Sequence, residues 1–175
     1  MPLYFAYGAN MNVAAMAGRC PGAKLVGKAR LARHRFFVMA SGWASVRRDP
    51  ARHVHGLLWD VPLADMRALD RFEDIASGLY LKAQQPVIPA EGAARRALVY
   101  IGAATEPGRP QPGYMEEVLE AAAAAGLPEA YRRELAAFLP AGRREAAKAA
   151  APVEPAAAPR VRPRFASPFD PGRSA

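Results

Sequence analysis

The sequence predicts either an α+β fold or a barrel with appended helices. Segments typical of strands recur between residues 3 and 101, whereas helical patterning dominates residues 113–138. Strands and helices therefore come in blocks, and not in the regular alternation of a βαβ fold. The chain has 175 residues, 51% of them hydrophobic, which is enough to fold one domain around one core.

The strands are predicted from apolar and aromatic runs bounded by turn residues. The first run ends at Tyr7-Gly8-Ala9-Asn10, a set typical of a turn. We expect strands at residues 3–6, 25–31, 35–40, 53–60, 79–86 and 96–101, with 41–50 as a loop or a pair of strands around Trp43.

The helices are predicted from apolar residues at helical spacing. In residues 62–72, Leu63, Met66 and Leu69 fall at i, i+3 and i+6, and Pro62 suits the first turn. Further helices are expected at residues 113–126 and 129–138, and Gly126 suits the C-terminal side of the first. A short helix is expected at 11–17, which Gly18 and Pro21 would stop.

The last part of the chain differs in composition. We place one domain at residues 1–140 and an Ala-, Pro- and Arg-rich tail at residues 141–175. We expect the tail to be disordered beyond about Ala150, and a short helix over 142–151 is an option. The tail holds seven basic and three acidic side chains, which is half of the net charge of +8. Nucleic-acid binding is one reading of this charge, but no aromatic-interleaved basic patch accompanies it, so we favour a solvated tail.

Several classes of protein are excluded or disfavoured by what the sequence lacks. It has no Walker A motif, no GxGxxG and no GxSxG. The single Cys20 cannot form an intramolecular disulfide, which fits a reducing compartment. No apolar run approaches the length of a membrane span, and no signal peptide is visible. We therefore expect a cytoplasmic protein. His53 and His55 share a face if their segment is a strand, but no third metal ligand is indicated, so we expect neither metal nor other cofactor.

Two motifs carry the candidate chemistry. An apolar strand ending in Tyr7-Gly8-Ala9-Asn10 can present backbone N–H groups to an anion or an oxyanion, although an ordinary strand end has the same appearance. The second motif, LDRFEDIASGLY at 69–80, places carboxylates at the C-terminal end of a helix, where the helix dipole disfavours them. Asp70 with Glu73, or Glu73 with Asp74, would serve acid–base chemistry, and a solvated acidic turn is the alternative.

Together these motifs resemble the γ-glutamylcyclotransferase family. The matching strings are YFAYGAN at 4–10, LARHRF at 31–36, HGLLWDVPLADMRALDRFEDIASGLY at 55–80, LVYIG at 98–102 and PQPGYMEEVLEAAAAAGLPEAY at 110–131, so the similarity spans nearly all of residues 3–140. The resemblance implies a small mixed β-barrel flanked by helices, with the N-terminal loop and an acidic residue facing one cavity.

The resemblance also assigns roles to residues. The family's acidic residue falls on Glu73, which would be the general acid/base. Substrate binding would fall on Tyr4, Phe5, Ala6, Tyr7, Gly8, Ala9, Asn10, Tyr80, Tyr100 and, less directly, Tyr114. Ala9 stands where the family usually has Ser, so the backbone N–H is kept and a hydroxyl is lost. Trp43 and the basic Arg47, Arg48 and Arg52 would be rim contacts or an exposed loop.

The implied reaction is cyclisation of a γ-glutamyl amide, derived from an amino acid or an amine, to 5-oxoproline with release of the amine. The partner is then a small-molecule γ-glutamyl substrate, with no membrane and no nucleic acid, and the protein would be a monomer or a homodimer. A basic rim would favour a leaving group that bears a carboxylate. The alternative is a non-catalytic small-ligand-binding module of the same fold, for which Ala9 is the one supporting feature.

Overall fold

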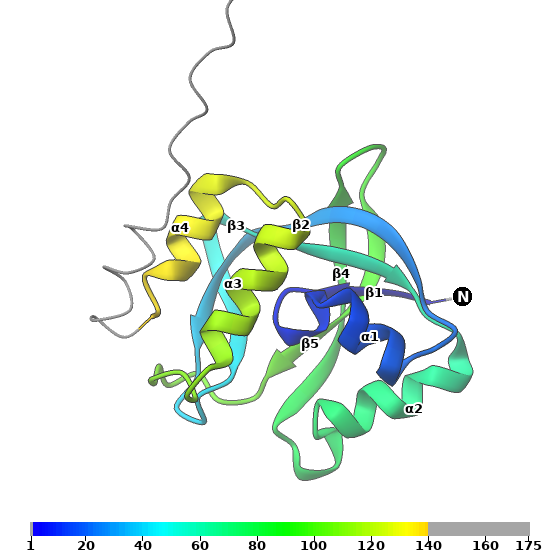
Figure 1. Cartoon of the computed structure of the whole chain (residues 1–175), viewed down its shortest axis with the longest axis horizontal. Coiled ribbons are helices and arrows are strands. Elements are labelled where there is room, and N and C mark those ends of the chain that lie inside the picture. Colours follow the sequence, from blue (N-terminus) through cyan, green and yellow to red (C-terminus); the bar gives the residue numbers. More distant parts are fainter. Residues whose placement is uncertain (1, 140–175) are drawn as a thin grey trace, which may run out of the picture.

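A closed barrel of five strands forms the centre of the computed structural model, which describes residues 2–139 (Figure 1). The strands are β1 (Leu3–Ala6), β2 (Lys24–Val38), β3 (Ala44–Asp60), β4 (Tyr80–Pro89) and β5 (Arg95–Gly102), and their order around the barrel is β1-β3-β2-β4-β5. β1 pairs antiparallel with β3 and parallel with β5, so the barrel is mixed. The predicted α+β fold with a small mixed barrel is confirmed.

One long hairpin, β2–β3, builds much of the barrel, and here the predicted strand boundaries were wrong. The strands expected at 25–31 and 35–40 are one continuous β2. Of the two alternatives for 41–50, a loop or a pair of strands around Trp43, the strand alternative holds from Ala44 onward, where β3 begins. The pairing shifts register between Ala32 and His34, where Arg33 has a φ of 58°. This bulge breaks the alternation of inward and outward side chains, which is why the sequence pattern suggested two strands.

Close approach between β1 and β3 requires a glycine. Phe5 pairs with Leu58 and Ala6 with Leu57. A Cβ added at Gly56 would collide with the carbonyl group of Ala6. Gly56 therefore lets the short β1, whose end carries the N-terminal motif, lie tightly against β3.

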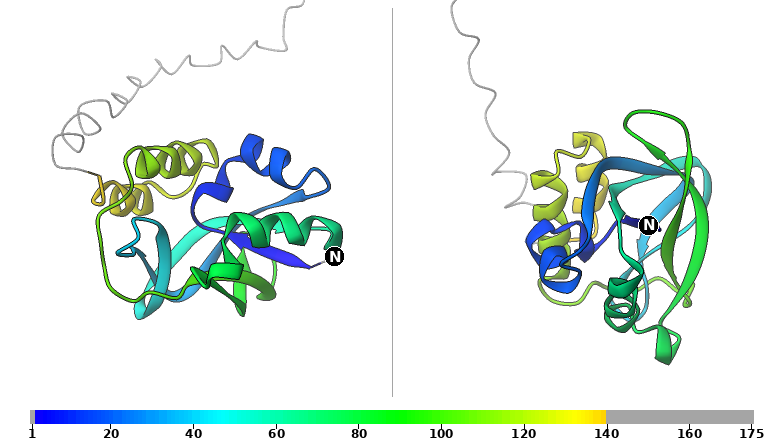
Figure 2. Two further views of the ribbon diagram at one scale, coloured as in Figure 1. Left: turned by 90° about the horizontal axis from the view of Figure 1, so that it is seen from below. Right: turned by 90° about the vertical axis from the view of Figure 1, so that its right-hand side faces the viewer.

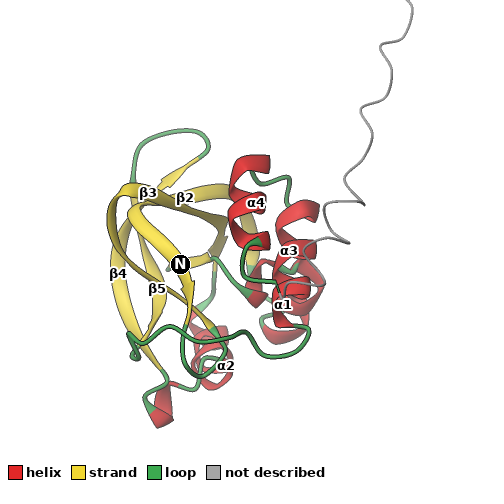
Figure 3. Ribbon diagram, turned by 90° about the vertical axis from the view of Figure 1, so that its left-hand side faces the viewer, coloured by secondary structure: helices red, strands yellow, loops and turns green. Residues whose placement is uncertain are grey.

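Four α-helices and two short 3₁₀ helices complete the described residues: α1 (Val13–Arg19), α2 (Leu63–Phe72), α3 (Tyr114–Ala124), α4 (Glu129–Ala136), η1 (Ala9–Met11) and η2 (Ile75–Ser77). α1, α3 and α4 lie along one side of the barrel, whereas α2 lies at one end of it (Figures 2 and 3). The helices expected near 62–72, 113–126 and 129–138 are confirmed. The short helix expected at 11–17 begins at Val13, because the Asn12 side chain accepts a hydrogen bond from the Ala15 N–H and caps it, and it continues through Gly18 to Arg19.

The core is one cluster that joins the barrel to the helices. α3 buries Tyr114, Met115, Val118, Ala121 and Ala122, which fall on one face at helical spacing. Each large apolar side chain that is fully buried in this way contributes about 1.5–3 kcal/mol. The helix is therefore held firmly enough for Tyr114, at its first turn, to serve a site.

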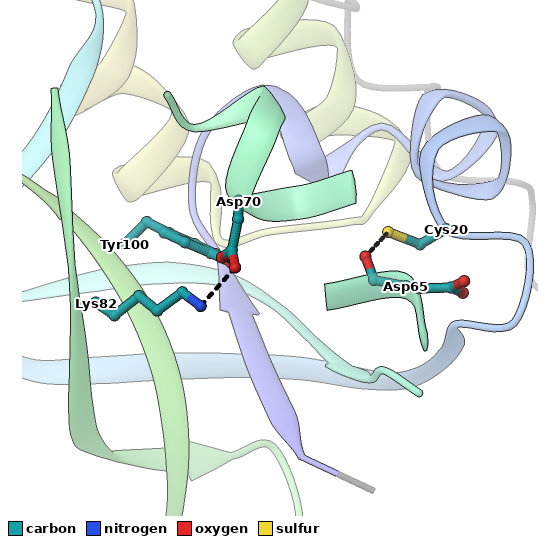
Figure 4. A network of polar contacts seen from close by, with 5 residues as sticks. All are labelled: Cys20, Asp65, Asp70, Lys82 and Tyr100. Atoms are coloured by element: carbon teal, nitrogen blue, oxygen red, sulfur yellow. Dashed lines mark hydrogen bonds and ion pairs between the residues drawn. The ribbon is translucent and has the colours of Figure 1, made fainter. Parts of the chain in front are cut away.

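α2 is tied to the segment that follows α1. The Gly22 N–H donates to Asp65 Oδ2 at 2.8 Å, and the Cys20 thiol donates to the Asp65 carbonyl oxygen at 3.7 Å (Figure 4). Because α2 buries only Leu69 completely, these polar contacts help to hold the first turn of the helix against the segment after α1. They link the two elements that bring Arg19 and Glu73 to the same region.

The predictions for the tail, namely the boundary near Pro140, disorder, and a helix over 142–151, lie outside the described residues. None of the helices within residues 2–139 combines the length and apolar character of a membrane-spanning helix.

Candidate active site

A cavity of about 420 Å³ opens where β1, the loop after it, α1, the end of α2, β4, β5 and α3 converge. It combines aromatic rings with a few polar groups, as small-molecule sites do. Its lining residues are Tyr4, Tyr7, Gly8, Ala9, Asn10, Arg19, Trp43, Ala44, Phe72, Glu73, Asp74, Leu79, Tyr80, Tyr100, Tyr114 and Glu117.

Glu73 reaches this cavity because it is the last residue of the α2 turn. Its N–H donates to the Leu69 carbonyl oxygen at 2.9 Å, so the backbone completes the helix at this point. The next residue, Asp74, has a φ of 49°, in the left-handed region, and this conformation turns the chain away from the helix axis. The carboxylate thus sits at the negative end of the helix dipole, against local preference, as the sequence predicts.

The Glu73 carboxylate is held by two neutral donors. Asn10 Nδ2 donates to Glu73 Oε1 at 2.9 Å, and the Tyr4 hydroxyl lies 3.4 Å from the same oxygen. Among residues 2–139, the hydrogen bonds to this carboxylate all end on Oε1, which leaves Oε2 for another partner. Burial raises the pKa of Glu73 to about 7, against the lowering effects of Tyr4, Arg19 and Asn10.

Asn10 is itself buried and fully engaged. Its Nδ2 donates to the Tyr4 hydroxyl at 2.9 Å as well as to Glu73, and its Oδ1 accepts from Arg19 Nη1 at 2.7 Å. The Arg19 guanidinium in turn lies 3.7 Å above the centre of the Phe72 ring. Arg19 is the only cationic side chain among the described residues that line the cavity, and it already has these two partners.

The tyrosines of the cavity present neutral hydroxyl groups. The Tyr7 hydroxyl donates to the Tyr100 carbonyl oxygen and the Tyr80 hydroxyl to the Ala44 carbonyl oxygen, each at 2.6 Å. Desolvation by burial raises the pKa of Tyr4, Tyr7, Tyr80, Tyr100 and Tyr114 above the ordinary value. They therefore serve as hydrogen-bonding and packing groups and not as bases.

Asp70, considered with Glu73 as an acid–base pair, has other partners. Its Oδ1 accepts from the Tyr100 hydroxyl at 2.7 Å, and its Oδ2 pairs with Lys82 Nζ at 2.6 Å; both side chains converge on it from neighbouring strands (Figure 4). Asp70 is not among the residues that line the cavity. Its position fixes the Tyr100 ring, which packs edge-on against Tyr4 with centroids 5.6 Å apart.

The loop Gly8-Ala9-Asn10 passes close to α3. A Cβ at Gly8 would lie 2.8 Å from the Tyr114 hydroxyl oxygen, so this position requires glycine. The backbone N–H groups of Ala9 and Ala44 hydrogen-bond the Tyr114 hydroxyl, which lowers its pKa against the larger effect of burial. The loop thus presents a backbone N–H toward the cavity, at the residue where a side-chain hydroxyl is missing.

Most of the site residues expected from the sequence meet in this cavity. Glu73, Tyr4, Tyr7, Gly8, Ala9, Asn10, Tyr80, Tyr100 and Tyr114 line it, and so does Trp43, whose ring packs edge-on against Tyr114. Phe5 and Ala6 do not line it: both are fully buried in the core.

The basic rim expected from Arg47, Arg48 and Arg52 is absent from the described cavity lining. Arg47 lies over the Phe37 ring, and Arg52 pairs with Glu134 of α4. The long β3 strand carries these side chains away from the cavity, which agrees with the strand alternative for residues 41–50 and not with the loop.

Sequence reasoning gave no site role to Arg19, Phe72 or Leu79, or to Glu117. Arg19 lies nine residues after Asn10, and α1, which starts directly beyond η1, folds back to place it there. The signal that could have identified Arg19 is the helix expected at 11–17, directly after the motif at 4–10. Glu117 lies one turn after Tyr114 on α3, and that spacing would have identified it.

His53 and His55 have no third ligand nearby. The His55 ring lies 5.0 Å from the Tyr131 ring, between centroids, and packs against α4. Residues 2–139 contain no group of three His, Cys, Asp or Glu side chains placed to hold a metal ion.

Comparison with known proteins agrees with this geometry. The model of the AIG2-like family matches residues 53–135. A mouse γ-glutamylcyclotransferase is 28% identical over 148 residues, which covers 79% of each chain, and a human γ-glutamylcyclotransferase matches with the same identity and coverage. A solved structure of a γ-glutamyl cyclotransferase superposes with a TM-score of 0.74 at 27% identity, over 79% of this chain and 88% of that one. The resemblance inferred from the motifs is confirmed.

Proposed function

We propose that the chain, which is related in sequence and fold to the γ-glutamylcyclotransferases, is an enzyme that cyclises a γ-glutamyl group to 5-oxoproline and releases an amine. The observation that carries the proposal is Glu73, a partly buried carboxyl group with a pKa raised to about 7 in a tyrosine-lined cavity. A base with a pKa near the working pH is best suited to transfer protons in both directions. No metal or other cofactor enters the proposed reaction.

The substrate supplies its own nucleophile. The α-amino nitrogen attacks the γ-carbonyl carbon, a C–N bond forms, and the five-membered ring closes. The α-amine is mostly protonated at neutral pH, so Glu73 accepts a proton from it through the free Oε2. The same proton then passes to the leaving nitrogen as the original amide C–N bond breaks. The ring nitrogen also gives up its second extra proton, which the released amine carries away as an ammonium group, so Glu73 returns to its starting state.

The remaining groups act by position and by polarity. The backbone N–H groups of Gly8, Ala9 and Asn10 would stabilise the negative charge that develops on the γ-carbonyl oxygen, provided that the Ala9 N–H exchanges the Tyr114 hydroxyl for that oxygen. The loss of one such donor typically reduces the rate by about 10²–10³. The aromatic walls, including Tyr80 and Tyr100, would hold the glutamyl chain in a conformation from which the ring can close.

The charges at the cavity favour an amine over an amino acid as the leaving group. Asp74 and Glu117, both exposed, contribute carboxylates to the lining, and Arg19 is already engaged with Asn10 and Phe72. A leaving group with its own carboxylate would meet like charge there, whereas a neutral or cationic amine would not. The apolar surface of Trp43 and Leu79 suits an alkyl chain.

The proposal is tested by the release of 5-oxoproline from a panel of γ-glutamyl amides. We expect turnover by the native protein and loss of at least about a thousandfold in Glu73→Gln, because the amide cannot accept the proton. Glu129→Gln is the matched control, since Glu129 is exposed on α4 and pairs with Arg133 far from the cavity. An active Glu73→Gln enzyme would contradict the assignment. Binding of γ-glutamyl compounds without turnover would favour the alternative, a binding module of the same fold.

A further inference from the structure

We propose that Arg19 is a positioning residue, whose guanidinium fixes the Asn10 amide so that its NH₂ group, and not its carbonyl oxygen, faces Glu73. The proposal rests on the proposed role of Glu73 as proton acceptor. It concerns a side chain that sequence reasoning did not connect with the site.

The first step of the argument is the chemistry of the donors. An arginine side chain has five N–H donors and no acceptor. The Asn10 atom that lies 2.7 Å from Arg19 Nη1 is therefore the carbonyl oxygen. The NH₂ group must then point the other way, where its two hydrogens meet the Tyr4 hydroxyl and Glu73 Oε1, both at 2.9 Å.

The second step concerns what fixes Arg19. Its guanidinium lies 3.7 Å above the Phe72 ring, and Phe72 is the residue directly before Glu73. The last turn of α2 thus carries both the Glu73 carboxylate and the Phe72 ring that the Arg19 guanidinium contacts. The contact between Arg19 and Phe72 therefore ties α1 to the end of α2 that carries Glu73.

The third step is the consequence of losing Arg19. Without the cation, the Asn10 amide is free to rotate by half a turn, and its oxygen would then face Glu73 Oε1. In that arrangement the amide oxygen accepts a hydrogen bond from a neutral carboxylic acid and repels a carboxylate, so it favours protonated Glu73. Loss of the positive charge acts in the same direction.

Other ionisable groups lie on the elements around Glu73, and among the described residues that line the cavity Arg19 is the only cation. The tyrosines are neutral near pH 7, and a carboxylate has no hydrogen to donate to Glu73. They are Tyr4 and Tyr7 near β1, Tyr80 of β4, Tyr100 of β5, Tyr114 and Glu117 of α3, Asp70 of α2, and Asp74 after it.

The test is a comparison of pH profiles. In the native protein, kcat/KM should rise with pH through the pKa of Glu73. In Arg19→Met, which keeps the length and apolar contact of the side chain, this acid limb should move upward by about one pH unit. Arg19→Lys keeps the charge and should shift the limb less. Arg67→Met, an exposed arginine on α2, is the matched control and should leave the limb in place.

A second variant removes the NH₂ group and keeps the partner of Arg19. Asn10→Asp retains an acceptor for the guanidinium, but it places an oxygen against Glu73. We expect an upward shift of the acid limb at least as large as that of Arg19→Met. A ¹³C NMR titration of the Glu73 carboxyl carbon in the three cavity variants measures the same shifts without any substrate, in protein whose cooperative thermal unfolding shows that it is folded.

The outcomes separate the inference from the proposed function. An unshifted Glu73 titration in both Arg19→Met and Asn10→Asp would overturn the positioning role, even if activity falls. A rise in KM for Arg19→Met with an unchanged acid limb would also overturn it, because Arg19 would then contact the substrate. An active Glu73→Gln enzyme would instead overturn the proposed function, and the NMR titration would still decide the role of Arg19.

Discussion

At the scale of the residue, Glu73 couples the site to the stability of the protein. Burial favours its neutral form and raises its pKa to about 7 in the folded state, against an ordinary value near 4.5. The contribution that Glu73 makes to the free energy of unfolding is therefore at its full value when the pH is below the unfolded-state pKa. It is lost as the pH rises through the folded-state pKa.

A pH-dependent difference in stability between native protein and Glu73→Gln is therefore expected. The glutamine has no charge to bury, so from pH 5 to pH 8 the native protein should lose about 2 kcal/mol relative to the variant. The measurement is chemical unfolding at the two pH values, with Glu129→Gln as the control for an exposed glutamate. Parallel pH dependences of native protein and Glu73→Gln would mean that Glu73 is not buried in its neutral form.

Asp74 shows what sequence reasoning captured at single positions and what it missed. The placement of carboxylates at the end of α2 was visible from the pattern, because the helix predicted at 62–72 puts Glu73 and Asp74 directly after it. The φ of 49° at Asp74 was not visible, because an aspartate carries no fixed signal for the left-handed region. The position of Arg19 was hidden for a related reason, since it depends on how α1 folds back over η1.

At the scale of the element, the turn from α2 into η2 is held in place by its backbone. The Leu79 N–H donates to the Asp74 carbonyl oxygen at 3.3 Å, and the Ser77 hydroxyl donates to it at 3.1 Å. The left-handed conformation at Asp74 lets Glu73 end the helix and face the cavity. A non-glycine residue there carries strain of about 1–2 kcal/mol.

Asp74→Gly should stabilise the fold. Relief of the strain exceeds the extra backbone entropy of glycine in the unfolded state, about 0.4–1 kcal/mol, so the expected gain is about 0.5–1 kcal/mol. Ala76→Gly, an exposed residue of the same 3₁₀ turn without a positive φ, is the matched control and should destabilise. Both values come from urea unfolding. A less stable Asp74→Gly protein would show that the carboxylate itself supports the turn.

The elements differ in how well the sequence predicted them. α2, α3 and α4 were predicted to within a few residues, because apolar spacing and the flanking Pro62 and Gly126 mark them. The β2–β3 hairpin was not, because its bulge at Arg33 interrupts the alternation on which strand prediction depends. The choice between a loop and a pair of strands at 41–50 also left open whether Arg47 reaches the cavity, and the paired strand β3 excludes it.

At the scale of the whole molecule, charge is distributed unevenly between the protein and its cavity. The chain carries a net charge of +8. Among the described residues that line the cavity, however, Glu73, Asp74 and Glu117 are acidic and Arg19 is the one cation. The net charge of the protein is therefore a poor guide to the charge of its substrate. The local field at the site should govern which leaving group is accepted.

We expect the order of kcat/KM to follow the charge of the leaving group. A γ-glutamyl diamine, with a free ammonium group at its far end, should exceed a neutral γ-glutamyl alkylamine, and γ-Glu-Ala should come last. Each exposed carboxylate contributes about 0.2–1 kcal/mol to such a contact, so Asp74→Asn or Glu117→Gln should each reduce the preference for the diamine by up to about fivefold. Added salt should reduce it further, because these charges are exposed and screened.

Two features of this experiment keep it decisive. Glu120→Gln, an exposed glutamate one turn beyond Glu117 on α3 and outside the cavity lining, is the matched control and should leave the preference unchanged. The neutral alkylamine serves as the internal reference, because its turnover should not respond to the loss of Asp74 or Glu117. A preference for γ-Glu-Ala over the diamine would contradict the expected order while leaving the cyclisation intact, and it would indicate that Arg19 exchanges Asn10 for the carboxylate of the leaving group.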